Sequence, residues 1–479
     1  MDGLKRKSAM ERWVIEEFSS LDLGDKRLNK RTKRILSDLS KSPLSSIPSC
    51  SKGWNETKAA YRCFSNPKLN SEKILAPHKQ ATIERARINK RVLVLQDTTD
   101  LNYSGQSQKQ GVGPTHHGTE RALLLHPCLV VNELGRCLGV YDDYQWYRSE
   151  LLSRTADKNT LNNERLHKKH VSEKESYRWV LGYKKATELA KNCPDTQVIM
   201  IADRESDLYD LYEEARKTEG TKADWLIRIR TTKRAIINDL GQRDNQLLYE
   251  KMNTLQPLET IEFEMPRRDN APTRKVQQEL RMAKLTLHPP TGRRGSLRCH
   301  PVTVTVLLAK EINTPAGEEP VVWWLMTSIP IAELQPSQLI LWYLCRWQIE
   351  VFFKILKSGC QIERLQLETA NRTKNCLALY LIIAWRILFL TSSAKSEPDT
   401  VCTSILDESE WKTAWIIVNQ KTPPKTPPSL QTAIVLIAKM GGYLARKNDS
   451  PPGPKAIWQG ITQLYHSINA IELAKKTYG

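Results

Sequence analysis

Two short apolar runs, each followed by an aspartate, most constrain the fold of this chain. Residues 91–96 (RVLVLQ) lead into Asp97, and residues 197–202 (QVIMIA) lead into Asp203. Runs of this length and composition are typical of buried strands. If the two strands are neighbours, both carboxylates emerge at the same sheet edge. An aspartate at a strand end is usually a helix cap or a turn former, so neither residue alone indicates a site.

The segments around these runs predict an α/β fold with an RNase H-like core. Residues 123–148 form two strand-like stretches joined by a turn at residues 132–135, and a helical pattern follows over residues 175–190. After Asp203 comes an amphipathic helical stretch at residues 206–215. With the strand before Asp97, this gives the order β-β-β-α-β-α, which an RNase H-like sheet presents.

Changes in pattern along the chain divide it into five segments, and the predicted core is interrupted by a β-rich insertion between helical N- and C-terminal domains. The division predicts a helical domain at residues 1–75 and a first part of the core at residues 76–220. The insertion follows at residues 221–320, the second part of the core at residues 321–395 and a second helical domain at residues 396–479. Apolar strand patterns separated by Pro, Gly and charged turns define the insertion.

An excess of positive charge points to a polyanionic partner. Lysine and arginine outnumber acids 72 to 53, a formal charge of +19, and such an excess attracts nucleic acid before specific contacts form. Residues 23–36 (LGDKRLNKRTKRIL) pack six of these cations into one helical pattern. Leu21, Leu28, Ile35 and Leu39 form an apolar stripe there, which leaves the cations facing outward. A solvated charged face is the alternative interpretation, because most such runs have that role.

A third carboxylate, Glu350, lies in a helical pattern with Tyr343, Arg346 and Lys357. At 100° per residue these four side chains fall within a sector of about 60° on one helix. Three carboxylates at one place repel each other unless divalent cations bind them, and the neighbouring cations and phenol suit phosphate groups. An ordinary amphipathic helix with a surface Glu–Arg pair would explain this motif if it stood alone.

Membrane insertion and disulfide bonding are not expected. No apolar run approaches the roughly 20 residues of a spanning helix, and the first residues lack the apolar stretch of a secretory signal. We therefore expect a cytoplasmic protein with no membrane partner. The ten cysteines include no C-x-x-C pair, so reduced core cysteines are expected rather than disulfides or a zinc site.

Several motifs together resemble the insertion-sequence-four family of DDE transposases. They are Asp97-Thr98-Thr99, residues 203–209 (DRESDLY) and the Tyr-Arg-Glu-Lys pattern around Glu350. The resemblance extends over nearly the whole chain, through residues 20–27 (SLDLGDKR), 59–67 (AAYRCFSNP), 321–328 (VVWWLMTS) and 437–460 (IAKMGGYLARKNDSPPGPKAIWQG).

The resemblance implies an enzyme that cuts and joins DNA. Its metal ligands would be Asp97, Asp203 and Glu350, holding two Mg²⁺ ions for which Mn²⁺ substitutes. Its DNA-binding residues would be Tyr343, Arg346, Lys357, Trp323, Arg228, Arg27 and Arg31. Trp323 would occupy the place of, or stack with, a base flipped out of a hairpin end, whereas Trp324 is expected in the core. The partners would be double-stranded DNA, at transposon ends and target, and a second subunit in a homodimer.

Some residues depart from the family's pattern, and two other functions stay open. Lys26, Leu28 and Lys30 differ, which implies a different end sequence, and Ser206 stands where alanine is usual. An RNase H-like nuclease or resolvase would cut DNA without joining it. A catalytically inactive relative would bind DNA and act as an inhibitor. The family resemblance further implies a bacterial protein, nucleoid-associated when bound to DNA. Gly441-Gly442 allows a close approach of helices, so we expect the C-terminal helices at residues 396–479 to pair two subunits.

Overall fold

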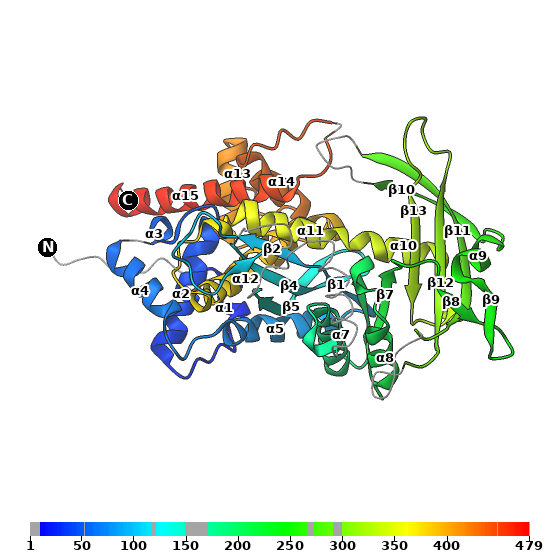
Figure 1. Ribbon diagram of the computed structural model, residues 1–479. Helices are drawn as coiled ribbons and strands as arrows, with labels where there is room; N and C mark the ends of the chain where they lie inside the picture. Colours follow the sequence, from blue (N-terminus) through cyan, green and yellow to red (C-terminus); the bar gives the residue numbers. More distant parts are fainter. Residues whose placement is uncertain are drawn as a thin grey trace. The chain divides into compact units, whose positions relative to one another are not determined.

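The computed structural model describes residues 10–51, 53–115, 121–148, 171–265, 273–290, 299–447 and 449–478. The chain forms two compact units, each assembled from separate stretches of sequence. The first unit comprises residues 1–85, 98–152 and 348–479, and the second comprises residues 86–97 and 153–347. Figure 1 shows the elements of both.

An antiparallel sheet lies in the first unit. Its strands are β2 (Thr99–Asn102), β3 (Gly113–Pro114), β4 (Arg121–Asn132) and β5 (Cys137–Trp146). β4 pairs with each of the other three. The predicted turn between β4 and β5 is confirmed, because the Asn132 side chain accepts hydrogen bonds from the Leu134 and Arg136 amides. Gly135 supplies the positive φ, +79°, that closes this turn.

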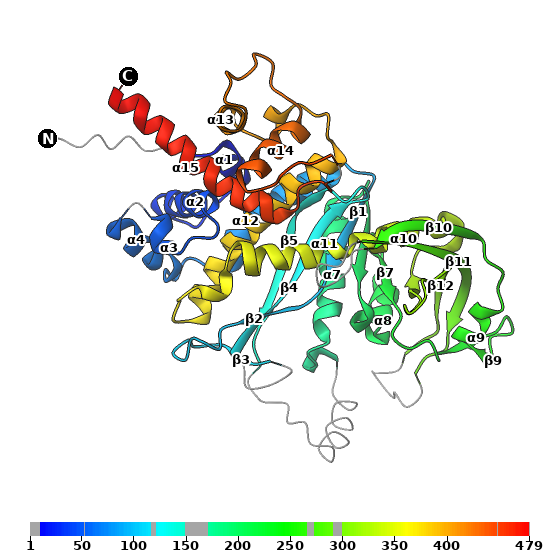
Figure 2. The same cartoon turned by 90° about the horizontal axis from the view of Figure 1, so that it is seen from above.

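Helices from both ends of the chain complete the first unit (Figure 2). They are α1 (Arg12–Glu17), α2 (Lys26–Lys41), α3 (Ile47–Cys50), α4 (Trp54–Phe64), α5 (Ser71–Arg87), α11 (Trp347–Lys354), α12 (Ala370–Ser396), α13 (Glu408–Asn419), α14 (Leu430–Met440) and α15 (Pro454–Tyr478). Residues 86 and 87 of α5 and residue 347 of α11 belong to the second unit. α12 contacts α2, α4, α14, α15 and β5, so N- and C-terminal helices pack on the same central helix.

α12 corrects one expectation from the sequence. It is long and apolar enough to cross a membrane by length and composition, although no run of that kind was expected. However, 94% of its most apolar window is buried inside the structure. A core helix that is packed on all sides has the same composition, because every face must be apolar.

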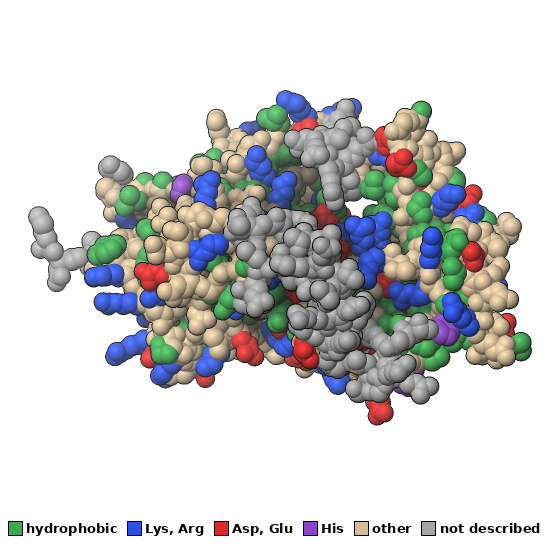
Figure 3. Space-filling model, viewed as in Figure 1, with side chains coloured by type: hydrophobic (Ala, Val, Ile, Leu, Met, Phe, Trp, Pro, Cys, Tyr) green, Lys and Arg blue, Asp and Glu red, His purple; other side chains and the backbone are tan. Residues whose placement is uncertain are grey.

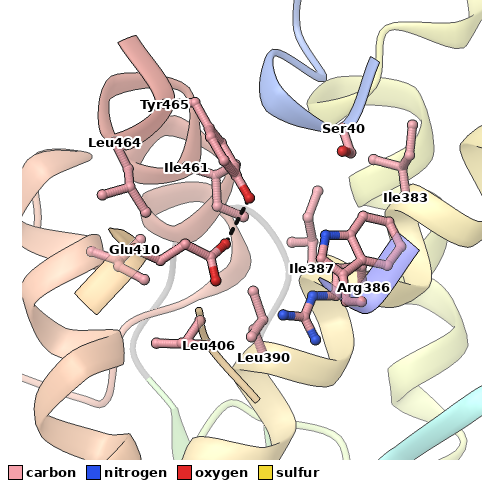
Figure 4. Close-up of a pocket in the computed structure, with 12 residues that line it drawn as sticks. Ser40, Ile383, Arg386, Ile387, Leu390, Leu406, Glu410, Ile461, Leu464 and Tyr465 are labelled. Carbon is pink, nitrogen blue, oxygen red and sulfur yellow. Dashed lines mark hydrogen bonds between the residues drawn. The ribbon is translucent and has the colours of Figure 1, made fainter. Parts of the chain in front are cut away.

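A buried polar cluster joins α1, α12, α13 and α15 (Figure 4). The Arg386 guanidinium donates to the Ile405 carbonyl at 2.8 Å and lies over the Trp13 ring at 5.3 Å. The Tyr465 hydroxyl donates to the Glu410 carboxylate at 2.6 Å. Burial lowers the pKa of Arg386 and raises that of Glu410, and each residue's charge opposes the shift of the other. The cluster lines a cavity of about 20 Å³, which is room for one water molecule.

Glycines bring two C-terminal helices, α14 and α15, close together within one chain. Gly441 and Gly442 were expected to bring helices of two subunits close together. In the structure the close approach is within one chain, because a Cβ on Gly441 would lie 2.0 Å from the Ala456 carbonyl oxygen of α15. A Cβ on Gly460 would likewise lie 1.9 Å from the Ile437 carbonyl oxygen of α14. These glycines therefore fix the α14–α15 packing inside the subunit.

The second unit is built on a mixed sheet. Its strands are β1 (Arg91–Gln96), β6 (Gln197–Ala202), β7 (Asp224–Arg228), β8 (Ala235–Ile237), β9 (Arg243–Leu247), β10 (Glu259–Met265), β11 (Arg274–Leu287), β12 (Val302–Ile312) and β13 (Val322–Thr327). β1, β6 and β7 are parallel neighbours, and β13, β12 and β11 continue from β7 with antiparallel pairing. The strands expected in the β-rich segment are thus present, and the first of them, β7, pairs with the parallel strands.

Helices pack beside this sheet in the second unit. They are α7 (Tyr177–Asn192), α8 (Tyr209–Lys217), α9 (Leu248–Asn253) and α10 (Pro336–Cys345). α7 lies close to β1, because a Cβ on Gly182 would be 2.0 Å from the Gln96 side-chain oxygen. The parallel strands carry fully buried apolar runs, as the sequence predicted. All ten cysteines of the chain are free, and eight of them are buried, whereas Cys50 and Cys345 are half-buried.

Acid is expected to destabilise the first unit through a buried group of charges. The Glu17 carboxylate accepts from His78 and Arg85, and the His78 side chain is fully buried. Burial raises the pKa of Glu17, but His78 and Arg85 outweigh it and lower that pKa from 4.5 to about 2. Burial also lowers the pKa of His78 from its ordinary 6.5, despite the opposing influence of Glu17.

Because both pKa values are lower in the folded state, the stability that these groups contribute is complete above pH 6.5 and falls as the pH drops. Protonating Glu17 between about pH 4.5 and 2 should remove roughly 3 kcal/mol. Urea unfolding of the parent and of Glu17→Gln across this range checks the expectation. The variant should show a flatter pH dependence, and equal slopes would contradict the assignment.

Candidate functional site

The two predicted strand-end aspartates occupy equivalent positions on neighbouring strands. β1 and β6 are parallel, and their register pairs Leu95 with Ile201. Asp97 and Asp203 each follow two residues later, so they leave the sheet at the same level. This confirms where the sequence placed them in the fold. Arg228 joins the same level, because β7 pairs Ile227 with Ala202.

Asp203 also caps a short helical turn. Its side chain accepts a hydrogen bond from the Glu205 amide at 2.8 Å, and η2 (Arg204–Ser206) begins there. The buried Ser206 hydroxyl donates to the Asp203 carbonyl at 2.6 Å. The capping role that an aspartate at a strand end usually has is therefore present here, and it fixes the direction of the Asp203 carboxylate.

Asp97 is paired with a cation of the predicted signature motif. The Arg346 guanidinium donates to the Asp97 carboxylate at 2.8 Å. The two side chains are 15% and 23% exposed, so the pair is only partly screened by solvent. Arg346 follows the last residue of α10 and keeps helical backbone angles. The Arg346 cation therefore balances the negative charge of the Asp97 carboxylate.

An aromatic group adjoins these charges. The Tyr343 ring is buried and meets the Trp323 ring edge-on, with centroids 5.4 Å apart. Burial raises the pKa of the Tyr343 hydroxyl, Arg346 and Arg228 oppose that shift, and Asp203 adds to it. The ring contact with Trp323 and the charges of Arg346, Arg228 and Asp203 place Tyr343 near four of the predicted site residues.

Trp323 has a second aromatic neighbour that the sequence did not reveal. Phe263 of β10 stacks on Trp323 with ring centroids 5.4 Å apart. The alternating pattern of β10 gave no sign of a role for Phe263. Trp324 corrects another expectation, because it is half-buried rather than a core residue. Both tryptophans thus lie in the half-buried part of β13, and only residues 325–327 of that strand are buried.

Glu350 and Lys357 lie on elements whose form differs from the prediction. The sequence predicted one continuous α-helix carrying four aligned side chains. Instead α10 ends before Arg346, α11 carries Glu350 in its first turn, and Lys357 lies in a π-helical turn, Ile355–Gly359. A π turn has more residues per turn than an α-helix, so the angle between Glu350 and Lys357 differs from the one that 100° per residue predicts.

Glu350 and Lys357 belong to the first unit, whereas Asp97 and Asp203 belong to the second. Lys357 Nζ lies 3.9 Å from the Glu363 carboxylate, and Glu350 is half-buried. Across the described ranges, no three His, Cys, Asp or Glu side chains are grouped so that they could hold a metal ion. The set of three carboxylates therefore stays a prediction.

A second group of cations lines a hollow in the N-terminal helices. Arg27 and Arg31 come from α2, and Lys58 and Arg62 come from α4. The hollow has a volume of about 560 Å³, and lysine and arginine side chains gather over α2 and α4 in Figure 3. Lys58 and Arg62 were missed in the sequence, although their spacing of four residues puts them on one helix face.

The apolar stripe predicted for this region is buried. Leu21, Leu28, Ile35 and Leu39 are each at most 8% exposed. α2 begins at a capped end, because the Asp25 side chain accepts from the Arg27 amide at 2.8 Å and the Leu28 amide at 3.2 Å. The helix thus turns its leucines inward and presents Arg27 to the hollow.

Three family models match the chain. Residues 10–69 match a transposase DNA-binding model, residues 183–386 match a transposase DDE domain, and residues 382–478 match the dimerisation domain of Tn5 transposase. The chain belongs to the DDE transposases. Together the matches are those of a Tn5-like DDE transposase, and they are consistent with the insertion-sequence-four resemblance.

The matches assign functions to parts of this transposase. It binds DNA, and it forms a homodimer. The DDE match makes it an enzyme that cleaves and transfers DNA, and domains of this kind generally use divalent metal ions. The DDE match is also consistent with an RNase H-like core. The β-rich part that interrupts this core and the helical N- and C-terminal regions are present in the structure. The DDE match contains Asp203 and Glu350 but begins after Asp97.

Proposed function

We propose that this transposase moves its element by cutting and pasting, with Asp97, Asp203 and Glu350 as its catalytic residues. The observation that carries the proposal is the pair of carboxylates at the ends of neighbouring parallel strands, surrounded by Arg346, Arg228 and the aromatic rings. Phosphoryl transfer at a DNA backbone needs carboxylates that bind cations beside cations that bind phosphates.

We propose that three carboxylates of this chain bind two Mg²⁺ ions. The support for this is chemical, because carboxylate oxygens are the ligands that Mg²⁺ prefers. Asp97, Asp203 and Glu350 would hold the ions, with Mn²⁺ as a substitute. When bound, the ions would lower the pKa of the attacking water and stabilise the leaving 3′ oxygen.

The protein's own side chains bind and orient the DNA in this proposal. Arg346, Arg228 and Lys357 balance phosphate charge, and the Tyr343 hydroxyl donates to a phosphate oxygen. A first hydrolysis frees the 3′-OH at the element's end, which then attacks the opposite strand to form a hairpin. Water reopens the hairpin, and the 3′-OH finally attacks target DNA. All four steps are phosphoryl transfers, so one site serves them by exchanging nucleophiles.

The proposed division of labour follows the predicted segments. Residues 1–75 bind the transposon ends, residues 76–220 and 321–395 form the catalytic core around the insertion at 221–320, and residues 396–479 pair two subunits. Ile416 and Ile417 on α13 and Leu473 on α15 are exposed apolar residues available for that contact. Each subunit would act on the end held by its partner. The protein would be cytoplasmic in its bacterial host and nucleoid-associated when bound to DNA.

The proposal is tested with purified protein, Mg²⁺ and DNA that carries the element's own ends. We expect nicks, hairpin ends and joined products in that order. Ca²⁺ should support complex formation without efficient cleavage, because its coordination is larger and less regular. Cleavage without joining would favour a nuclease or resolvase, and binding without cleavage would favour an inactive inhibitory relative.

Trp323 gives a separate prediction about the hairpin step. Its ring is half-buried between Phe263 and Tyr343, and we propose that it stacks with, or takes the place of, the base that leaves the helix. Base stacking on an aromatic side chain is worth roughly 1–3 kcal/mol. Trp323→Ala should therefore slow hairpin formation or resolution by about 10- to 100-fold, while first-strand nicking stays near normal.

Trp324→Ala is the matched control, because it removes the same side chain from the neighbouring position on the opposite face of β13. We expect it to lower the melting temperature without a selective effect on the hairpin. Single-turnover assays on nicked and intact ends separate the two steps. If Trp323→Ala slows nicking as much as hairpin formation and lowers the melting temperature, the stacking role is wrong.

A further inference from the structure

Asp207 has a buried carboxylate that the proposed mechanism does not use. Its side chain is 0% exposed. Two backbone amides donate to Oδ2, from Arg230 at 2.8 Å and from Thr231 at 3.2 Å. Oδ1 accepts from the Arg234 guanidinium at 2.5 Å and from the Tyr212 hydroxyl. A buried charge is unfavourable unless it is satisfied in this way, so the carboxylate holds all four donors in fixed places.

The four donors come from two different parts of the second unit. Tyr212 lies on α8, whereas Arg230, Thr231 and Arg234 lie in the connection that follows β7. That connection begins directly after Arg228, the last residue of β7. The Arg230 and Thr231 amides are bound at fixed positions two and three residues beyond Arg228.

Asp207 is also connected to Asp203 through a short helical turn. It follows η2, whose first residue is capped by Asp203 and whose last residue, Ser206, donates to the Asp203 carbonyl. The Asp207 amide in turn donates to the Arg204 carbonyl. One short turn thus separates the Asp203 carboxylate from the carboxylate that anchors the segment after Arg228.

We propose that Asp207 is a positioning residue of the transposase, which fixes the Asp203 turn and the Arg228 strand end relative to each other. It does not touch DNA, because it is buried. The proposal rests on the roles given above to Asp203 and Arg228. Misplacing a reacting group by about 1 Å costs on the order of 100-fold in rate, so loss of this anchor acts on the chemical step.

The first test is Asp207→Ala in the full-length protein, assayed by single-turnover cleavage of pre-bound ends. We expect the rate constant to fall by about 10- to 100-fold, with the dissociation constant for end DNA unchanged. A purely structural residue would instead reduce the amplitude, because fewer molecules are folded, and leave the rate constant of the folded fraction unaltered. That second outcome would overturn the proposal.

Tyr212→Phe is the matched control, because it removes one donor to Oδ1 and leaves both amide bonds to Oδ2. Its rate constant should equal the parent's. The double variant Asp207→Asn, Arg234→Gln is the rescue, since the asparagine oxygen still accepts from the amides and its nitrogen faces a glutamine oxygen. It should recover most of the rate, and it keeps the test decisive if the alanine variant does not fold. A rescue variant as slow as Asp207→Ala would contradict the role given to the amide bonds.

Hydrogen exchange separates this proposal from the proposed function. In the DNA-free protein, the amides of Arg230 and Thr231 should exchange faster in Asp207→Ala than in the parent or in Tyr212→Phe. If exchange behaves so but the parent never cleaves end DNA, the proposed function fails and the anchor stands. If the parent cleaves but exchange and rate constant are both unchanged in Asp207→Ala, the anchor fails alone.

Discussion

Alanine in place of Asp203 is expected to slow cleavage at the element's end by on the order of 1,000-fold or more. Loss of a metal ligand removes several kcal/mol of transition-state stabilisation, and each 1.36 kcal/mol is tenfold in rate. Asp97→Ala and Glu350→Ala should have the same effect. End binding should stay within about twofold of the parent, because the proposed end-binding cations lie on α2 and α4. Single-turnover cleavage and binding titrations measure both quantities.

The structure supplies controls that separate ligation from folding at this position. Asp203→Asn keeps an oxygen that accepts from the Glu205 amide, so the cap of η2 survives while the charge is lost. It should be as inactive as the alanine variant but melt like the parent. Glu205→Gln removes a nearby carboxylate that is paired with Arg178 at 2.5 Å, and it should cleave at a near-normal rate. Substantial cleavage by Asp203→Asn would remove Asp203 from the set of metal ligands.

Neutralising Arg27 and Arg31 together should weaken end binding by roughly 10- to 100-fold at physiological salt. Both side chains line the hollow between α2 and α4. Each phosphate contact contributes about one unit to the slope of log K against log salt concentration, so the double glutamine variant should lose about two units. Titrations of end DNA at several salt concentrations measure affinity and slope together.

The matched control for that variant lies on the same helix. Lys26 and Lys30 are exposed on α2 and do not line the hollow. Lys26→Gln with Lys30→Gln removes the same total charge, and we expect a smaller loss of affinity. If the arginine variant binds ends as tightly as the parent, the hollow is not the end-binding surface. Equal losses in the two double variants would mean that net charge matters rather than the place of the cations.

The strand-end aspartates could be predicted because their signal is local. A short apolar run rich in β-branched residues and bounded by polar residues is typical of a buried strand, and a residue that directly follows the strand lies at the sheet edge. The pairing of Leu95 with Ile201 on parallel strands then confirms that Asp97 and Asp203 leave the sheet at the same height. The buried stripe of α2 was predictable for the same reason, since helical periodicity depends only on spacing.

Features that depend on contacts between distant residues could not be predicted. The interruption at Arg346 and the π turn at Lys357 alter hydrogen bonding within a pattern that still looks helical. Phe263 reaches Trp323 only through the pairing of β10 with β11, and the Gly441 contact needs α15 folded back on α14. The roles of Glu350 and Lys357 still rest on their motif.

The central claim of a two-metal site is tested most directly by anomalous diffraction from crystals of the protein bound to its element's end and Mn²⁺. The account predicts two manganese peaks about 3.5–4 Å apart. Carboxylate oxygens of Asp97, Asp203 and Glu350 should lie within about 2.3 Å of them. Manganese bound elsewhere, with none of these three carboxylates as a ligand, would contradict the account.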